Sequence, residues 1–489
     1  MGVSTSAISR VTGVEVSYKN FNAGKAALLP QRLAIVGPGN SNVAYSTKKY
    51  ECESSAALVA ERYGYGSPLH LACLQLFPQS GNGASFPVTI YPVTEGASAV
   101  AAAGSLGATG TATANGSGKI YIGGIVAEFA VTKDDTNDTI LGAIKTAIDG
   151  VLNMPVTAGE VTDHTIALTS KCKGTIGNLI KIELDAAIAG ITFTVTQLSD
   201  GSIDGDVDSA LAAIGNVWET VILDLYPYNN STNLDKYQNF GEGRWGVLNK
   251  KGCLVAHGCT DNYATRTAVT DARPNDYINF LIESCGSREL PYVVAAKGLV
   301  NDIMTQADKD PACGYKGLLT GLHTGDDLNQ EDYNVRNQAV SKGASTNIKE
   351  GSAARLNDII TFYHPAAEGK YPSRRYVVDM MKLMNIVYNV RLIMEADSMI
   401  GVPLVPDEDV VTNPNAVQPK MVVTAFVNLA KSLAKKALIS DAEFTKKNLK
   451  VAIDSENPKR LNIQFPVKLS GNIEVSSTDV YFGFYLGGE

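Results

Sequence analysis

The first residues whose types and spacing could support chemistry are the glycines of Gly37-Pro38-Gly39. They follow the apolar run of residues 33–36, and a glycine-rich turn after a buried strand is where many α/β proteins bind a phosphate. The turn lacks the third glycine of the dinucleotide fingerprint and the Gly-Lys-Ser/Thr of a P-loop. The pattern is typical of an ordinary strand-exit turn. A nucleotide-binding α/β enzyme that uses this turn is the alternative hypothesis.

Other candidate reactive groups have no supporting spacing. The acidic string of residues 200–208 fails the EF-hand pattern, because Ser209 and Gly215 stand where the glycine and the bidentate glutamate should be. Ser432-Leu433-Ala434-Lys435 matches Ser-x-x-Lys without the accompanying Lys-Thr-Gly or Ser-Asp-Asn. The five histidines and seven cysteines form no His-x-x-x-His or Cys-x-x-Cys pair. We therefore predict no catalytic residue, no metal site and no cofactor, and a chain that is not an enzyme.

Composition excludes several classes of protein. The chain has 489 residues, 45% of them hydrophobic and 19% charged, which is ordinary for a globular protein of several domains. Its net charge of −8 argues against direct nucleic-acid binding. Residues 1–16 lack the apolar centre of a secretory signal. The best candidate for a membrane span, residues 380–402, is interrupted by Lys382, Asn385, Arg391, Glu395 and Asp397. We expect a protein that folds in a cytoplasm, with reduced cysteines and no membrane insertion.

Predicted strands and predicted helices alternate along the chain, and these are the elements that must position any site. Short apolar runs at residues 33–36, 88–91, 221–223, 254–256 and 292–295 predict buried strands, and helical spacing falls between them. This alternation predicts a mixed α/β (α+β) chain whose partly parallel sheet is flanked by helices. Long helices are expected over residues 374–400, with an apolar stripe from Val377 to Leu392, and over residues 419–438.

A change of composition predicts an inserted domain. Residues 95–206 are rich in Ala, Gly and Thr and poor in large aromatics, and turn residues bound the segment. Strands are expected at residues 125–132 and 191–196, with a helix at residues 138–152. We interpret the segment as a small, β-rich α/β domain on the outer surface.

The C-terminal residues read as β-structure almost to the last position. Alternation from Leu461 to Leu469 puts the apolar side chains on one face, and apolar or aromatic residues recur from position 473 to position 486. Terminal segments are usually polar and frayed. Such a segment must pair either inside its own domain or with another chain, by adding a strand to that chain's sheet.

Several motifs in order resemble the contractile tail sheath proteins of the Mu-like type, found in contractile bacteriophages and tailocins. They are Thr12-Gly13-Val14-Glu15-Val16 with residues 30–37, Asp310-Pro311-Ala312 with residues 318–322, residues 336–340 with 343–346, residues 357–363, and Pro466-Val467-Lys468-Leu469-Ser470-Gly471. The resemblance covers nearly the whole chain. Residues 95–206 correspond to a variable domain of such sheaths, and the resemblance does not fix their role.

The resemblance implies a helical or stacked-ring polymer of identical subunits around a tail tube, with baseplate and tail terminator proteins as further partners. The sheath would assemble in the bacterial host cytoplasm, become part of the virion, and contract to drive the tube through the host envelope for genome delivery. The same fold in a tailocin or a secretion-type injection apparatus stays open. The implied domains are an N-terminal arm (1–20), a sheath body (21–94 and 207–365), the insertion (95–206), a C-terminal sheath domain (366–470) and a C-terminal arm (471–489).

Extended β-arms in such sheaths donate strands to neighbouring subunits, which implies the same role for both ends of this chain. The candidate intersubunit residues are Val14, Val16, Tyr18, Ile473, Val475, Val480, Tyr481, Phe482, Phe484 and Tyr485.

A basic stretch near the C-terminus is the candidate contact with the tube. Residues 431–460 hold eight basic residues against four acidic ones, in a chain whose net charge is −8. A solvated helix face is one explanation. The other, implied by the resemblance, is that Lys431, Lys435 and Lys436 face an acidic tube surface.

Overall fold

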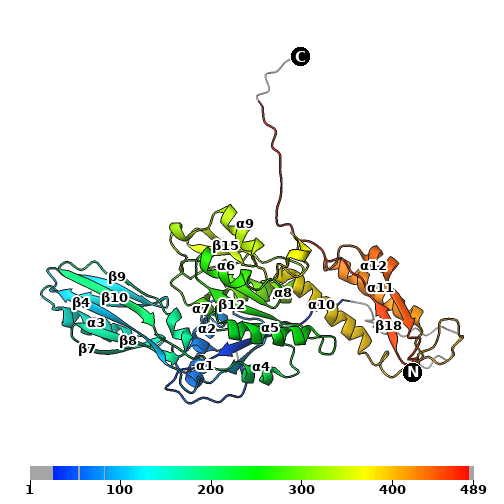
Figure 1. Cartoon of the computed structure of the whole chain (residues 1–489), viewed down its shortest axis with the longest axis horizontal. Coiled ribbons are helices and arrows are strands. Elements are labelled where there is room, and N and C mark those ends of the chain that lie inside the picture. Colours follow the sequence, from blue (N-terminus) through cyan, green and yellow to red (C-terminus); the bar gives the residue numbers. More distant parts are fainter. Residues whose placement is uncertain (1–25, 53–54, 82, 370, 484–489) are drawn as a thin grey trace, which may run out of the picture. The chain divides into compact units, whose positions relative to one another are not determined.

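The structure, a computed structural model, describes residues 26–52, 55–81, 83–369 and 371–483 (Figure 1). The chain divides into two compact units, a body of Leu29–Met384 and a C-terminal unit of Asn385–Glu489 with Met1–Leu28. Both helices and several sheets are present, so the predicted mixed α/β class is confirmed. Across the described residues, no helix combines the length and apolarity that crossing a bilayer would need.

A six-stranded sheet forms the core of the body. Its order is β13-β12-β11-β1-β3-β2, and every neighbouring pair is parallel except β2 with β3 at the edge. The strands other than β2 are buried along their whole length, which explains why they read as continuous apolar runs. The bounds are β1 (Leu33–Gly37), β2 (Tyr50–Cys52), β3 (Val88–Pro92), β11 (Val221–Asp224), β12 (Leu254–Cys259) and β13 (Asn279–Glu283).

Helices accompany these strands, and a small antiparallel sheet, β14-β16-β15, adds to the body (Figure 1). The helices are α1 (Ala56–Tyr63), α2 (Pro68–Leu76), α4 (Asp208–Ile214), α5 (Ser231–Trp245), α6 (Tyr263–Asp271), α7 (Pro291–Gly298), α8 (Met304–Lys309) and α9 (Tyr333–Ser341). A π-helical turn, Leu299–Ile303, joins α7 to α8. The small sheet contains β14 (Leu318–Leu319), β15 (Thr346–Glu350) and β16 (Ala353–Asp358).

The strand predicted at residues 292–295 is wrong, because these residues lie in helix α7. Pro291 occupies the first turn, where its missing N–H costs no hydrogen bond. All residues of α7 except Lys297 are buried, and a helix that is covered on every side shows no amphipathic period. A short apolar run therefore could not distinguish this helix from a strand.

Residues 95–206 form two antiparallel sheets and a helix. One sheet has the order β10-β4-β8-β7 and the other β6-β5-β9. Backbone hydrogen bonds in both directions join Val100 to Ser202, so the chain enters and leaves the segment at one β-bridge. The bounds are β4 (Ala101–Gly110), β5 (Gly116–Ile122), β6 (Ile125–Val131), α3 (Asn137–Asp149), β7 (Val156–Thr162), β8 (Thr165–Lys173), β9 (Ile182–Asp185) and β10 (Ile191–Ser199).

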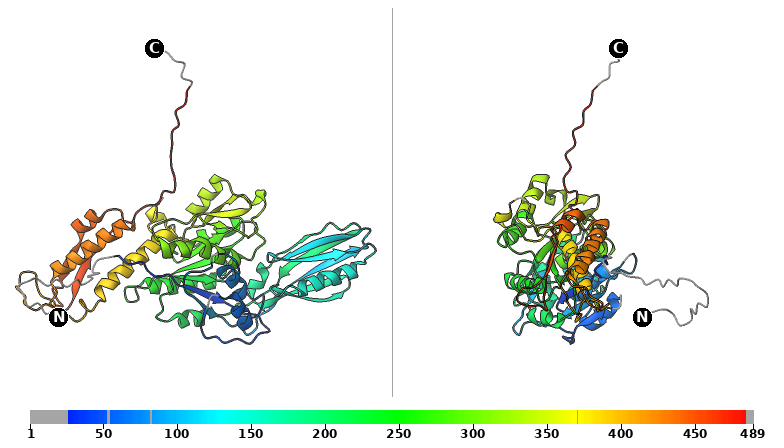
Figure 2. Two further views of the ribbon diagram at one scale, coloured as in Figure 1. Left: turned by 180° about the vertical axis from the view of Figure 1, so that it is seen from behind. Right: turned by 90° about the vertical axis from the view of Figure 1, so that its right-hand side faces the viewer.

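The C-terminal unit is built on two long helices and a β-hairpin (Figure 2). Helix α11 (Pro419–Lys435) lies within the predicted range, and it buries Val422, Phe426, Leu429 and Leu433 on one side. The hairpin of β17 (Lys450–Ile453) and β18 (Leu461–Gln464) packs its apolar side chains against Phe426. The other helices are α10 (Val377–Met394), which crosses from the body into this unit, and α12 (Ala442–Asn448).

Two details of the C-terminal prediction are wrong. Leu392 lies in α10 but is 46% exposed, so the predicted apolar stripe does not stay buried to its end. The strand expected from Leu461 to Leu469 ends at Gln464, and Pro466 follows two residues later. Proline has no N–H to donate to a ladder, which accounts for the early end. Leu469 makes only an isolated bridge with Ile439.

Candidate assembly surfaces

Neighbouring side chains pack closely against the turn Gly37-Pro38-Gly39. The turn leads into an irregular stretch, and the next helix, α1, begins only at Ala56, so no helix begins directly after the turn as it does in a phosphate-binding loop. A Cβ on Gly37 would lie 2.6 Å from Leu225, and one on Gly39 would lie 2.7 Å from Tyr45. Close packing by these side chains therefore explains both glycines without a ligand.

Hydrogen bonds and ion pairs occupy the acidic string of residues 200–208. Asp204 accepts from the backbone N–H and hydroxyl of Thr175 at 2.7 and 2.6 Å. Asp206 and Asp208 both pair with Lys236, at 2.6 and 3.0 Å. Within the described part of the chain, no group of three His, Cys, Asp or Glu side chains is placed to hold a metal ion.

One polar network was not anticipated from the sequence. His257 lies between Asp224 and Asn279, at 3.2 Å from the carboxylate and 2.9 Å from the amide, on three adjacent parallel strands. Tyr237 donates its hydroxyl hydrogen to Asp224 at 2.9 Å. All four side chains are buried, so no substrate can reach them, and the network serves to hold the sheet and α5 together. No sequence motif signals it, because the residues meet only through the order of the strands.

The C-terminal segment is fastened to its unit as far as Ser470. Backbone N–H groups of Ser440 and Ser470 donate to the carbonyls of Lys468 and Leu438, at 2.9 and 3.4 Å. Lys468 pairs with Asp441 at 3.1 Å, and Asp441 caps α12 by accepting from the Phe444 N–H at 2.8 Å. That N–H and the Lys468 ammonium hold the pKa of Asp441 below its usual range. This fastening defines where the segment leaves the unit.

Beyond Ser470 the described chain has no regular secondary structure (Figures 1 and 2). Its large apolar side chains are exposed. The exposed fractions run from 77% to 95% for Ile473, Val475, Val480, Tyr481 and Phe482. A solvated tail is usually polar, whereas this segment exposes several large apolar side chains that lie close together in the sequence. Of the other predicted arm residues, Val14, Val16, Tyr18, Phe484 and Tyr485 lie outside the described residues.

The hairpin β17–β18 offers a surface to which a further strand could add. Its sheet has two strands, so the outer edge of each strand pairs with no other strand in the described chain. Unpaired edges present N–H and C=O groups to any extended segment that approaches. Sequence reasoning missed this acceptor, because the four-residue run at 450–453 is too short to stand out as a strand.

The basic stretch forms an exposed face. Lys431, Lys435 and Lys436 lie at the end of α11 on the side away from its buried residues. No acidic side chain of the described residues forms an ion pair with these three lysines, whereas Lys446 and Arg460 have distant partners at 3.8 and 3.9 Å. Three cations that no neighbour neutralises favour an acidic partner, and they are equally compatible with solvation alone.

Comparison with known proteins finds a relative that is similar to this chain over nearly its whole length. The chain is 25% identical over 478 residues to the Mu-like prophage FluMu tail sheath protein of Haemophilus influenzae, which covers 95% of this chain and 96% of that protein. No protein-family model matches. A sheath tail protein from Desulfitobacterium hafniense superposes with a TM-score of 0.47 and 13% identity, covering 94% of this chain and 97% of the other. One from Listeria innocua gives a TM-score of 0.49 and 10% identity, over 92% and 94%.

Proposed function

We propose that this chain is a Mu-like tail sheath protein, the structural subunit of a contractile sheath that polymerises helically around a tail tube. The observation that carries the proposal is the similarity to the Haemophilus influenzae sheath protein, which extends over 95% of the chain. A likeness of that extent includes the body, the insertion and the C-terminal unit. The proposed role is structural, without catalysis or a cofactor.

Strand donation is the proposed mode of assembly. The exposed apolar residues after Ser470 supply a segment suited to a strand, and the hairpin β17–β18 of another subunit supplies open edges. A contact between two different surfaces of one chain generates a ring if the rotation between subunits closes and a helical filament if it does not. Val14, Val16 and Tyr18 of the N-terminal arm are proposed to pair with neighbours in the same way.

The remaining partners follow from the position of a sheath. The face of Lys431, Lys435 and Lys436 is proposed to contact the tube, while the ends of the polymer meet baseplate and terminator proteins. Assembly would take place in the bacterial host cytoplasm and give a virion component whose contraction drives the tube through the host envelope. A tailocin or a secretion-type apparatus would use the same subunit contacts.

Negative-stain microscopy of the purified full-length chain tests the proposal. Tubes of uniform diameter, assembled without any added protein, are the expected result. Thermal unfolding in the presence of ATP, GTP and NAD tests the alternative of a nucleotide-binding enzyme. A stabilisation that saturates with one nucleotide, together with a chain that stays monomeric at every concentration, would reject the sheath role in favour of the enzyme.

The insertion is proposed to be an outer domain that the polymer contacts do not need. Because Val100 and Ser202 form a β-bridge, residues 101–201 can be replaced by an Asn-Gly turn without moving the two chain ends. We expect the shortened chain to fold and to form tubes like the full-length chain, as seen by circular dichroism and negative stain.

The insertion also touches the body, which calls for a control. Lys181 donates to the Ser287 carbonyl at 2.8 Å, and the Ser41 N–H donates to the Lys171 carbonyl at 2.9 Å. The variant Lys181→Ala in the full-length chain measures the effect of losing one such contact. A shortened chain that is unfolded, while Lys181→Ala behaves like the wild type, would show that the segment belongs to the core.

A further inference from the structure

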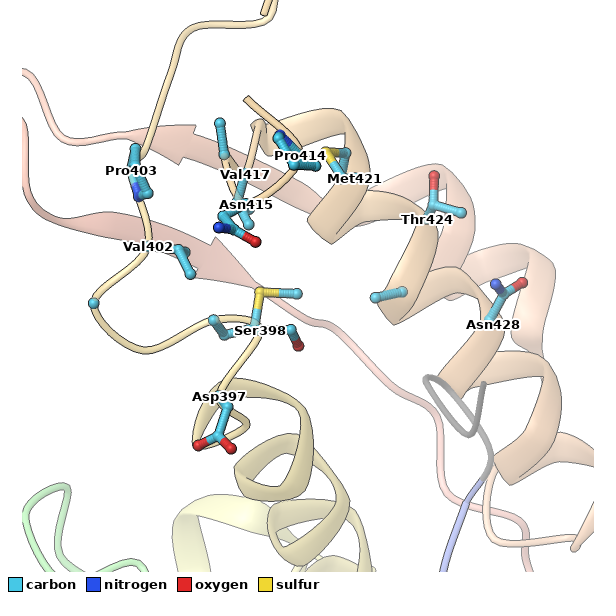
Figure 3. A pocket seen from close by; sticks show the side chains of 14 residues that line it. Asp397, Ser398, Val402, Pro403, Pro414, Asn415, Val417, Met421, Thr424 and Asn428 are labelled. Carbon is cyan, nitrogen blue, oxygen red and sulfur yellow. The ribbon is translucent and has the colours of Figure 1, made fainter. Parts of the chain in front are cut away.

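A hollow in the C-terminal unit has apolar walls and lacks an occupant in the described chain. It has a volume of about 810 Å³ and lies between the segment that follows α10, the loop before α11 and α11 itself (Figure 3). Its apolar lining includes Met399, Val402, Val417, Met421 and Ala425. Met421 is 49% exposed although it faces this apolar hollow. Methionine sulfurs make favourable contacts with aromatic rings, so the lining suits an aromatic side chain.

The rim of the hollow carries one charge. Asp397 lies on it together with Ser398, Asn415, Thr424 and Asn428. No basic side chain in the described chain forms an ion pair with Asp397, which is exposed. An occupant with an aromatic group and a neighbouring cation would therefore match both the walls and the rim.

The N-terminal chain is anchored close to this hollow. Ala26 donates its backbone N–H to the Ser432 hydroxyl of α11 at 2.8 Å. Ala27 exchanges two hydrogen bonds with the Asn389 side chain of α10, at 2.7 and 2.9 Å. Residues Leu29–Met384 belong to the body, whereas Ala26 and Ala27 are grouped with the C-terminal unit that contains the hollow.

The distance that the chain can span from Ala26, together with its sequence, identifies Phe21 as the candidate occupant of the hollow. Phe21 lies five positions before Ala26, an extended reach of about 17 Å. From Ser432, the lining residues Asn428 and Met421 lie about 6 and 17 Å away along the axis of α11. Lys19 and Lys25 flank Phe21 and can supply the cation for Asp397.

We propose that Phe21 of the same chain docks in this hollow and fixes the point at which the residues before it leave the C-terminal unit. Attachment five residues away gives Phe21 an effective concentration in the millimolar range, which a group on another molecule lacks. The inference does not depend on the proposed sheath function, because it concerns one chain alone.

Cysteine cross-linking of the full-length chain tests the inference. The variant Phe21→Cys with Thr424→Cys, in a Cys313→Ser background that removes the exposed native thiol, is oxidised mildly and analysed by non-reducing electrophoresis and peptide mass spectrometry. We expect an intrachain disulfide that forms at least about tenfold faster than in the matched pair Phe21→Cys with Lys447→Cys. Equal rates in the two pairs would overturn the proposal. A dimer linked through the two introduced thiols would also overturn it, by assigning the hollow to a second copy.

Limited proteolysis supplies a readout that does not need engineered thiols. Trypsin should cleave after Lys19 and Lys25 several-fold faster in Phe21→Ala than in the wild type, because the docked ring restrains this stretch. Phe21→Leu, which keeps an apolar side chain, should lie between them. Identical cleavage of all three proteins at these lysines would overturn the proposal.

Discussion

Removal of residues 473–489 should give a folded, monomeric chain that forms no tubes. The described part of this segment, residues 473–483, contains no strand and exposes its apolar side chains, so the free energy of unfolding should change by less than about 0.5 kcal/mol. Each backbone hydrogen bond of a donated strand contributes roughly 1 kcal/mol net, so about six residues contribute several kcal/mol to each contact. Light scattering and negative stain measure assembly, and urea unfolding measures stability.

A shorter truncation is the matched control. Removal of Gly487, Gly488 and Glu489 alone leaves every aromatic residue of the arm and should preserve the tubes. Double substitution of Val480 and Phe482 by Asp keeps the length but removes the apolar face, and it should act like the long truncation. Normal tubes from the chain that ends at residue 472 would show that assembly does not use this strand.

Replacement of Lys431, Lys435 and Lys436 by Glu should prevent extended assembly on the tube while self-assembly of the sheath continues. The three side chains are exposed at the end of α11, so the fold should tolerate the change. If each lysine makes one exposed ion pair with the tube, the loss is about 0.5 kcal/mol each, or about tenfold in affinity per subunit. The loss repeats at every subunit along the tail. Co-assembly with purified tube, followed by electron microscopy, measures the effect.

A second triple variant separates a specific contact from a change of net charge. Lys48, Lys49 and Lys133 are exposed in the body, and their replacement by Glu makes the same change of charge. We expect this protein to assemble on the tube like the wild type. Wild-type assembly on the tube should also weaken as salt is raised, because salt screens exposed charges. Equal loss in both triple variants would refute a tube contact at α11.

Apolar runs predicted most of the central sheet because parallel strands are buried on both faces. Residues 33–36, 88–91, 221–223 and 254–256 all lie in its strands. The same criterion failed at residues 292–295, since a fully buried helix presents the same run of apolar letters as a strand. The order of the strands could not be predicted from the sequence, because it depends on pairing between distant segments. The His257 network depends on that order and could not be predicted either.

The insertion and the C-terminus were predicted less completely. Strands near Ile125 and Ile191 and helix α3 are confirmed, but β4, β5 and β7 to β9 were missed, because small residues such as Ala, Gly and Thr give a weak alternation. At the C-terminus the alternation of apolar and polar residues suits a strand, but a strand also needs a second strand to pair with. The alternation does not identify that second strand. The arm residues and the lysine face therefore stay predictions.

The β-bridge between Val100 and Ser202 has a consequence for how such proteins diversify. A domain whose two ends meet at one pair of residues can be exchanged by recombination without changing the path of the chain on either side. If the inserted residues lie on the outside of a sheath, as proposed, natural selection can alter the exterior of the particle, for example its recognition by antibodies or its adhesion to surfaces, without changing the contacts between subunits. The same junction is a site for genetic fusion, at which a foreign folded module could be displayed in regular array.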